Sequence, residues 1–209
     1  MTTPTPGGSE AARLEALWSG DFGQQYVARN KDAGHDRGAF WSSLLARTQA
    51  RTVLEVGCNV GANLVHVSEH VPPVDVWGVD VNLDALGIIR SRLPQVNSGY
   101  AVARNLPFRD GWFDLTFTVA VLIHVPEDAF ALAVGELVRC ARRHVLVVEY
   151  FAAETTEVNY RDQTGAFFKR DYGRLIGGLF PELTLEDSGE LTKAEGFDDG
   201  LGWWLFAKP

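Results

Sequence analysis

The sequence is poor in cysteine and in positive charge. Two cysteines, Cys58 and Cys140, among 209 residues do not make a disulfide framework. Lys and Arg number 19 against 27 Asp and Glu, which gives a formal net charge of −8. A nucleic-acid partner requires clustered basic residues to neutralise phosphates. We therefore expect neither a disulfide-stapled fold nor a nucleic-acid partner.

Long apolar runs and a targeting segment are also missing. No run approaches the ~20 apolar residues of a membrane span. Residues 1–9 have neither the basic start nor the apolar core of a signal peptide, so we expect a cytoplasmic protein with no membrane partner. Their Thr, Pro and Gly content predicts a disordered tail. Residues 10–209 have the length of a single domain.

A glycine-rich turn follows a short apolar run in residues 53–61, which read Val-Leu-Glu-Val-Gly-Cys-Asn-Val-Gly. A strand that leads through such a turn into a helix is where α/β proteins bind nucleotide-like ligands. Gly57 and Gly61 do not fit the dinucleotide motif, because Asn59 stands where its middle glycine would be. This disfavours a NAD-dependent reductase. Glu55 lies within the apolar run, and a buried acid needs a partner.

A second apolar run, residues 74–79, ends at Asp80, nineteen residues after Gly61. An acid at this distance, at the tip of the second strand, can accept hydrogen bonds from a ribose diol. Asp80 and Asn82 are also good N-caps for the helix expected next. The two roles are compatible, and both interpretations stay open.

Two later segments complete a recognisable order. Residues 103–108 read Ala-Arg-Asn-Leu-Pro-Phe, and an apolar run at 115–121 is followed by His124. The order of glycine turn, strand-end acid, Leu-Pro-Phe turn and strand-end histidine resembles the class I methyltransferases that depend on S-adenosylmethionine. The resemblance covers residues 50–150 well and the last third of the chain weakly.

This resemblance implies S-adenosylmethionine as the cofactor. Asn105 stands in place of the family's usual Asp, and it would contact the adenine together with the backbone amide of Leu106. The N-terminal helices of the family cover the cofactor, so Arg29 would pair with its carboxylate and Tyr26 with the same group. A solvated Arg29 and a packed Tyr26 are the alternatives. The implied cofactor contacts are Tyr26, Arg29, Glu55, Gly57, Cys58, Asn59, Gly61, Asp80, Val81, Asn105, Leu106 and Val119.

A narrower resemblance concerns the N-terminal segment. Residues 17–30 read Leu-Trp-Ser-Gly-Asp-Phe-Gly-Gln-Gln-Tyr-Val-Ala-Arg-Asn. They look like the W-x-G-x-F-G-x-x-Y-x-x-R-N segment of methylases called pseudaminic acid biosynthesis-associated. Residues 58–61, 169–173 and 203–206 fit the same group. Kinship of this kind does not fix a substrate.

The expected architecture is α/β: a Rossmann-like class I methyltransferase fold. Alternating strands and helices in the core predict a parallel sheet with right-handed crossovers. The family adds an antiparallel last strand, which makes a seven-stranded, mostly parallel sheet with helices on both faces. Residues 10–50 would form a helical lid and residues 51–150 the cofactor-binding core. Residues 151–209 would hold the substrate segment and the last strands.

The chemistry of methyl transfer sets what the site must do. The sulfonium makes the methyl group electrophilic, so the site must mainly align the reactants, and we expect no metal. His124 is the best candidate for a base, because its ordinary pKa of about 6.5 suits proton transfer at neutral pH. The alternative is that His124 only orients the substrate. Glu149 and Tyr150 are weaker candidates for the base.

The acceptor is expected to be a small molecule. Tyr160, Arg161 and Tyr172 lie where this family places substrate-binding residues, although they could equally be surface residues. The hypothesis is transfer of a methyl group to an O or N atom of a small metabolite, for example a modified sugar or a natural-product intermediate. The alternatives are a non-catalytic cofactor-binding module and a non-methylating enzyme on the same fold. A homodimer is a further possibility.

Overall fold

The computed structural model describes residues 9–31, 36–161, 163–198 and 200–209. Of the expected disordered tail only Ser9 is among them, so that prediction otherwise lies outside the described residues. The Ser9 hydroxyl caps helix α1 (Glu10–Ser19) by accepting a hydrogen bond from the Ala12 amide at 3.3 Å. None of the helices in these ranges has the length and apolar character that a membrane span requires.

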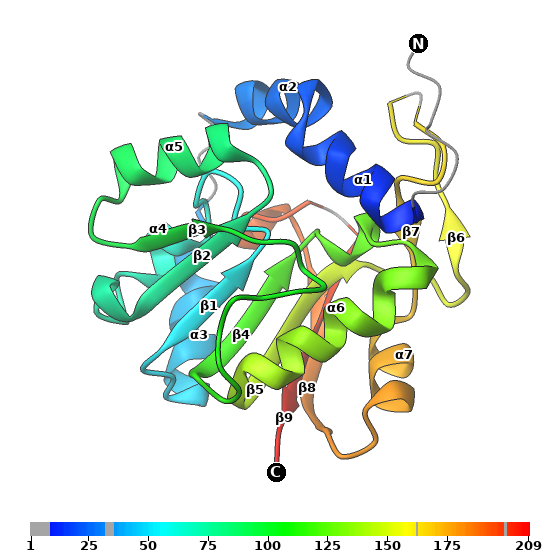
Figure 1. Ribbon diagram of the computed structural model, residues 1–209. Helices are drawn as coiled ribbons and strands as arrows, with labels where there is room; N and C mark the ends of the chain where they lie inside the picture. The colour runs from blue at the N-terminus through cyan, green and yellow to red at the C-terminus, as the bar shows by residue number, and fades with distance from the viewer. Residues whose placement is uncertain (1–8, 32–35, 162, 199) are drawn as a thin grey trace.

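Seven strands form one sheet in the order β3-β2-β1-β4-β5-β9-β8 (Figure 1). Strands β1 to β5 run parallel, and β9 runs antiparallel to both of its neighbours. The expected fold, a mostly parallel seven-stranded sheet with an antiparallel last strand, is confirmed. The strands are β1 (Val53–Val56), β2 (Val76–Asp80), β3 (Asn97–Tyr100), β4 (Phe113–Val119), β5 (Ala141–Tyr150), β8 (Thr184–Leu191) and β9 (Leu201–Ala207).

Helices cover both faces of the sheet, which explains why its central strands are apolar throughout. On one face, α6 (Glu127–Cys140) and α7 (Tyr172–Leu179) share a core with residues such as Leu54. On the other face lie α3 (Gly38–Thr48), α4 (Leu64–Val67) and α5 (Leu83–Arg92), in a core that includes the fully buried Trp41. All four residues of β1 are buried between these two cores.

Helices α1 and α2 (Asp21–Asn30) form a cover of their own above the sheet (Figure 1). The expected lid, residues 10–50, divides into two parts. Helix α3 packs into the core on one face of the sheet, whereas α1 and α2 lie across the carboxyl edge of the sheet. A two-stranded sheet of β6 (Thr156–Glu157) and β7 (Phe168–Lys169) stands beside the cover.

Two strands differ from their sequence-based bounds. The second strand begins at Val76 rather than at residue 74, because Pro73 starts a 3-10 turn, η1 (Pro73–Asp75). The fourth strand ends at Val119 rather than at residue 121, because Ala120 has a φ of 55° and turns the chain into η2 (Leu122–His124). A third short turn, η3 (Lys193–Glu195), precedes β9.

The buried carboxylate at the start of β4 gives a test of what holds this sheet together. Asp114 accepts hydrogen bonds from the Arg51 amide and from Arg142 Nε, both at 2.9 Å. Burial alone would raise the pKa of Asp114, but Arg142 and the backbone donors outweigh it and hold the pKa below its ordinary 3.8. The stabilisation is therefore present at neutral pH and is lost as the pH falls through the lower, folded-state pKa.

We expect Asp114→Asn to lower the free energy of unfolding at pH 7 by on the order of 1–3 kcal/mol, because one of its two acceptor oxygens is lost. Urea unfolding measures the effect. Arg142→Gln removes the partner, so the double variant should lose less than the sum of the two single variants. Strictly additive losses would show that the two side chains do not interact.

Candidate active site

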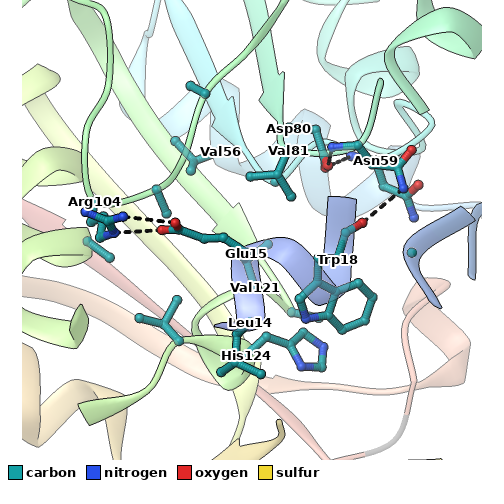
Figure 2. A pocket seen from close by; sticks show the side chains of 18 of the residues that line it. Leu14, Glu15, Trp18, Val56, Asn59, Asp80, Val81, Arg104, Val121 and His124 are labelled. Atoms are coloured by element: carbon teal, nitrogen blue, oxygen red, sulfur yellow. Dashed lines mark hydrogen bonds and ion pairs between the residues drawn. The ribbon is translucent and has the colours of Figure 1, made fainter. Parts of the chain in front are cut away.

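A cavity opens at the carboxyl ends of β1, β2 and β4, beneath α1 and α2 (Figure 2). It encloses about 1030 Å³ of empty space, open solvent included. Small apolar side chains such as Ala101, Ala103, Ala129 and Ala133 make up much of its wall. Polar groups are few and lie at defined points, as in sites that bind a small organic ligand.

The glycine turn after β1 forms the floor of the cavity. Gly57 has a φ of 77°, and a Cβ there would lie 2.2 Å from Cγ2 of Val121, so the turn requires glycine. The amides of Gly57 and Cys58 donate to the Val79 carbonyl at 2.8 and 3.0 Å. The Oδ1 of Asn59 is buried without a hydrogen-bond partner among the described residues. The turn is thus tied to β2 and leaves an acceptor open at the cavity.

Asp80 stands at the tip of β2 and faces the cavity (Figure 2). Its two oxygens accept hydrogen bonds from the amides of Asn59 and Asn82, each at 2.8 Å. Burial raises the pKa of Asp80, and these amide donors oppose the rise. Asn82, rather than Asp80, is the N-cap of α5, with its Oδ1 accepting from the amides of Asp84 and Ala85. Each Asp80 oxygen keeps a lone pair for a ligand hydroxyl.

The cover is fastened to the rim of the cavity by polar contacts. Glu15 of α1 and Arg104 form a two-point ion pair, at 2.7 and 2.9 Å, across one side (Figure 2). Asn82 Nδ2 donates to the Trp18 carbonyl at 3.1 Å on the other side. Arg13 donates to the Thr164 carbonyl at 3.2 Å, which ties α1 to the segment between β6 and β7. These contacts close the cavity over its ligand space.

His124 ends the η2 turn on the cavity wall. Its Nδ1 lies 2.6 Å from the Ala166 carbonyl, so Nδ1 carries the proton and Nε2 is left as an acceptor. Burial lowers the pKa of His124 to about 4, which keeps the imidazole neutral at physiological pH. The Trp18 indole covers it at 4.3 Å between ring centroids (Figure 2), with Tyr160 and Phe167 each at 5.6 Å.

A buried acid holds this turn from the sheet side. Glu149, fully buried at the end of β5, accepts hydrogen bonds from three successive amides of the turn. The donors are Val121 at 3.0 Å, Leu122 at 2.8 Å and Ile123 at 3.2 Å. Burial raises the pKa of Glu149 to about 7, opposed by these donors. Its oxygens face backbone amides, so Glu149 holds the turn in place.

A buried arginine holds the same turn from the other side. Arg170 is 1% exposed and donates to the carbonyls of Leu122 and Val125, each at 3.0 Å. Its guanidinium lies between the rings of Phe130 and Phe168, at 5.1 and 4.7 Å. Sequence reasoning did not assign this role to Arg170, because the contact spans 48 positions and no local pattern indicates it.

Comparisons with known proteins agree with this architecture. Residues 53–144 match the family model described as "Methyltransferase domain". An O-methyltransferase of Penicillium expansum is 28% identical over 109 residues, which cover 49% of this chain and 39% of that protein. Norajmaline N-methyltransferase of Rauvolfia serpentina is 30% identical over 83 residues, which cover 37% of this chain and 28% of that protein. The matches thus span less than half the length of these relatives.

Solved structures extend the likeness to the whole chain. The 1,6-didemethyltoxoflavin-N1-methyltransferase of Burkholderia thailandensis, bound to 1,6-didemethyltoxoflavin and S-adenosylhomocysteine, has a TM-score of 0.74 at 15% identity. That match covers 100% of this chain and 93% of the other. Magnesium protoporphyrin IX methyltransferase from Synechocystis PCC 6803, with bound S-adenosylmethionine, gives a TM-score of 0.71 at 14% identity and covers 99% and 100% of the two chains. Residues 53–144 thus resemble a methyltransferase domain, and the chain as a whole has the fold of these S-adenosylmethionine-dependent methyltransferases.

The domain brings about half of the sequence-predicted site residues to the cavity. Those that line it are Tyr26, Gly57, Asn59, Asp80, Val81, Val119 and His124. Cys58, within the turn, does not line the cavity and is only 2% exposed. Burial raises the pKa of its thiol well above the ordinary value. Gly61 packs toward Ile89, and Arg29 is exposed on α2. Glu55 is buried beside Asn63, behind the glycine turn.

The two residues predicted to contact adenine, Asn105 and Leu106, lie outside the lining of the cavity. Ala103 and Arg104 of the same turn line it. Asn105 is exposed, and the Leu106 amide donates to Glu136 Oε2 at 2.6 Å, so this amide already has a partner. The reason is a tight turn, in which the Asn105 amide donates to the Val102 carbonyl at 3.0 Å. This turn places Asn105 and Leu106 beyond the rim of the cavity.

The three predicted substrate residues are placed differently from one another. Tyr160 lies against His124 and Phe167, at the edge of the site. Arg161 is exposed, with its guanidinium over the Tyr160 ring at 5.8 Å. Tyr172 is fully buried in the core, and its hydroxyl donates to the Phe168 carbonyl at 2.8 Å, so no surface is left for a substrate. Within the described ranges, no group of three or more His, Cys, Asp or Glu is arranged to hold a metal ion.

We expect Glu149→Gln to disturb the η2 turn, because an amide nitrogen would face a backbone N–H where an oxygen now accepts. The free energy of unfolding should fall by on the order of 1–3 kcal/mol. The ¹⁵N signals of the His124 imidazole should show loss of the single Nδ1–H tautomer. The exposed Glu182→Gln is the control. An unchanged imidazole spectrum would rule out the positioning role.

Proposed function

We propose that the cavity binds S-adenosylmethionine and that the protein transfers its methyl group to an O or N atom of a small molecule. The observation that carries this proposal is the placement of Asp80. Its carboxylate is fixed by two amides at the tip of β2 and faces a cavity whose floor is the Gly57 turn. A ribose diol fits a rigid carboxylate at this point, with each hydroxyl donating to one oxygen.

Orphaned polar atoms support the fit of the cofactor. Asn59 Oδ1 and Trp18 Nε1, from residues that line the cavity, are buried without a hydrogen-bond partner among the described residues. An acceptor and a donor left unpaired cost free energy until a ligand satisfies them. The alanine-rich wall around Ala101 and Ala129 leaves room for a flat ring such as adenine.

The geometry suits methyl transfer once both reactants are in place. Bound S-adenosylmethionine supplies an electrophilic methyl group on a sulfonium. Asp80 and the glycine turn fix one reactant, while the cover and the apolar wall exclude water and restrict the other. His124 lines the cavity, and because its Nδ1 bonds the Ala166 carbonyl, its Nε2 would be the atom to take a hydrogen bond or a proton from the O–H or N–H of the methyl acceptor.

The chain's own closure favours a small acceptor. The contacts of Arg13, Glu15 and Trp18 hold α1 over the cavity, and the β6–β7 segment closes the side next to His124. These described elements leave less room for a folded macromolecule than for a metabolite. The names of two relatives state O- or N-methyl transfer, and this supports an O or N atom as the methyl acceptor.

The narrower sequence expectations remain part of this proposal. The resemblance of residues 17–30 to pseudaminic acid biosynthesis-associated methylases suggests a modified sugar as one acceptor class to screen. The heteroaromatic ligand of the Burkholderia thailandensis enzyme suggests another. A homodimer, a cytoplasmic location and the lack of a nucleic-acid partner stay predictions from the sequence.

Calorimetric titration with S-adenosylhomocysteine tests the proposal directly. We expect binding with a Kd in the micromolar range, on the order of 7–8 kcal/mol, and no binding of NADH. Asp80→Asn should weaken S-adenosylhomocysteine by about 10- to 100-fold, because charge-assisted bonds to the ribose are lost. Binding of NADH in place of S-adenosylhomocysteine would refute the assignment.

His124→Gln should leave the affinity for S-adenosylhomocysteine nearly unchanged and lower turnover by ~100-fold, if Nε2 takes the proton. The exposed His70→Gln is the matched control. Because burial lowers the pKa of His124 to about 4, the pH profile of kcat/KM should have no limb from this residue near the ordinary imidazole pKa of about 6.5. A limb there that vanishes in His124→Gln would contradict the buried, neutral imidazole.

A further inference from the structure

Aromatic rings from three separate segments gather around His124. Trp18 belongs to α1, Tyr26 to α2, and Tyr160 and Phe167 to the segment between β6 and β7. The Trp18 indole lies 4.3 Å from the imidazole between centroids, and the rings of Tyr160 and Phe167 each lie 5.6 Å from it. We call these five residues the aromatic cluster. No segment supplies it alone, so it forms where the cover and the β6–β7 segment meet the η2 turn.

Part of the aromatic cluster faces the cavity. Trp18, Tyr26 and His124 line the cavity, and each of them is partly exposed. The indole and the Tyr26 ring meet edge to face, at 5.4 Å between centroids and an angle of 85°. Figure 2 shows the indole and the imidazole close together on the cavity wall, apart from Asp80. The cluster therefore offers aromatic surface to a molecule bound on the His124 side of the cavity.

Hydrogen-bonding groups are scarce on this side of the cavity. Asn59, Asp80 and Asn82 lie at the glycine turn and the tip of β2, and Glu15 and Arg104 are paired with each other. The other described lining residues with a polar side-chain atom are Trp18, Tyr26 and His124. A sugar bound here would leave most of its hydroxyls without a partner, which is costly in a closed site.

A planar aromatic molecule suits such a wall. Aromatic rings attract one another in edge-to-face and offset contacts, and the gain exceeds that of apolar burial alone. Such a molecule also needs few hydrogen bonds, because a single ring O–H or N–H can be satisfied by the imidazole. His124 Nδ1 is bonded to the Ala166 carbonyl, so Nε2 is the ring nitrogen left for a ligand.

We propose that the methyl acceptor is a planar aromatic molecule, a phenol or an N–H heterocycle, that lies against the Trp18 indole and presents its O–H or N–H to His124 Nε2. The inference rests on the proposed function and favours this class over a modified sugar. The acceptor oxygen or nitrogen forms a bond to the methyl carbon, and its proton passes to Nε2. The electron pair of the broken S–C bond stays on sulfur, which leaves S-adenosylhomocysteine.

Two probes of the same shape test the contact with the indole. The probe 2-naphthol is planar and aromatic, whereas 2-decalol has the same carbon skeleton and hydroxyl on saturated rings. N-acetylneuraminic acid represents the sugars. Calorimetry uses the full chain saturated with S-adenosylhomocysteine. We expect 2-naphthol to bind about 5- to 10-fold more tightly than 2-decalol, and no binding of the sugar.

Substitutions of Trp18 locate the preference. Trp18→Leu should reduce the difference between the two probes to within about twofold, while Trp18→Phe, which keeps a ring, should retain part of it. Trp112→Leu is the matched control, because Trp112 is 39% exposed and precedes β4 at the opposite edge of the sheet. It should leave the affinities for both probes unchanged. Thermal unfolding and the affinity for S-adenosylhomocysteine show whether each variant is folded.

The contrary outcomes separate the inference from the proposed function. Equal affinities for the two probes, no binding of 2-naphthol, or binding of the sugar alone would overturn the aromatic acceptor, although S-adenosylhomocysteine still binds. A preference for 2-naphthol that survives in Trp18→Leu would overturn the contact with Trp18. A wild-type chain that does not bind S-adenosylhomocysteine would overturn the proposed function and this inference with it.

Discussion

Backbone amides at the carboxyl edge of the sheet need acceptors, and buried carboxylates supply them. Asp80 takes the amides of Asn59 and Asn82, and Glu149 takes three amides of the η2 turn. These acids pair amides of the two turns that carry Asn59 and His124, and backbone carbonyls such as that of Val79 pair others, so both turns have a fixed course. Burying these carboxylates costs desolvation free energy. In exchange, the turns that form the walls of the site are fixed before any ligand binds.

Side chains that make more than one hydrogen bond also explain where the cover of α1 and α2 attaches. Asn82, which caps α5 with its oxygen, uses its amide nitrogen for the Trp18 carbonyl, so one side chain links β2, α5 and the cover. Trp18 in turn lies on the imidazole of His124. Asp80, Asn82, Trp18 and His124 therefore belong to one connected network that joins the tip of β2, the cover and the η2 turn.

Local pattern in the sequence was enough to predict the fold and to place the glycine turn, Asp80 and His124 at the carboxyl edge of the sheet, because each strand and the turn that follows it have a local signature. It was not enough for contacts between distant segments. Ala166 fixes the tautomer of His124 across 42 positions, and Arg170 reaches Leu122 across 48. The predicted adenine contacts, Asn105 and Leu106, lie outside the cavity lining for a different reason: a tight turn at residues 102–105 determines which side chains of this segment reach the cavity, and the sequence motif does not specify that turn.

Two acid and arginine pairs in this domain use their hydrogen-bonding capacity differently. Around η2, both oxygens of Glu149 accept from backbone amides and Arg170 donates to two carbonyls, so both side chains hold the chain, while Arg170 Nε is buried without a partner among the described residues. Behind the glycine turn, Glu55 and Arg37 each spend only part of their capacity on the chain. Natural interiors leave few polar atoms unpaired, but such an atom occurs in both pairs, so it does not by itself indicate a ligand. The two acids differ in what they hold: Glu149 accepts from backbone amides of a turn, whereas Glu55 accepts from the side chain of Asn63.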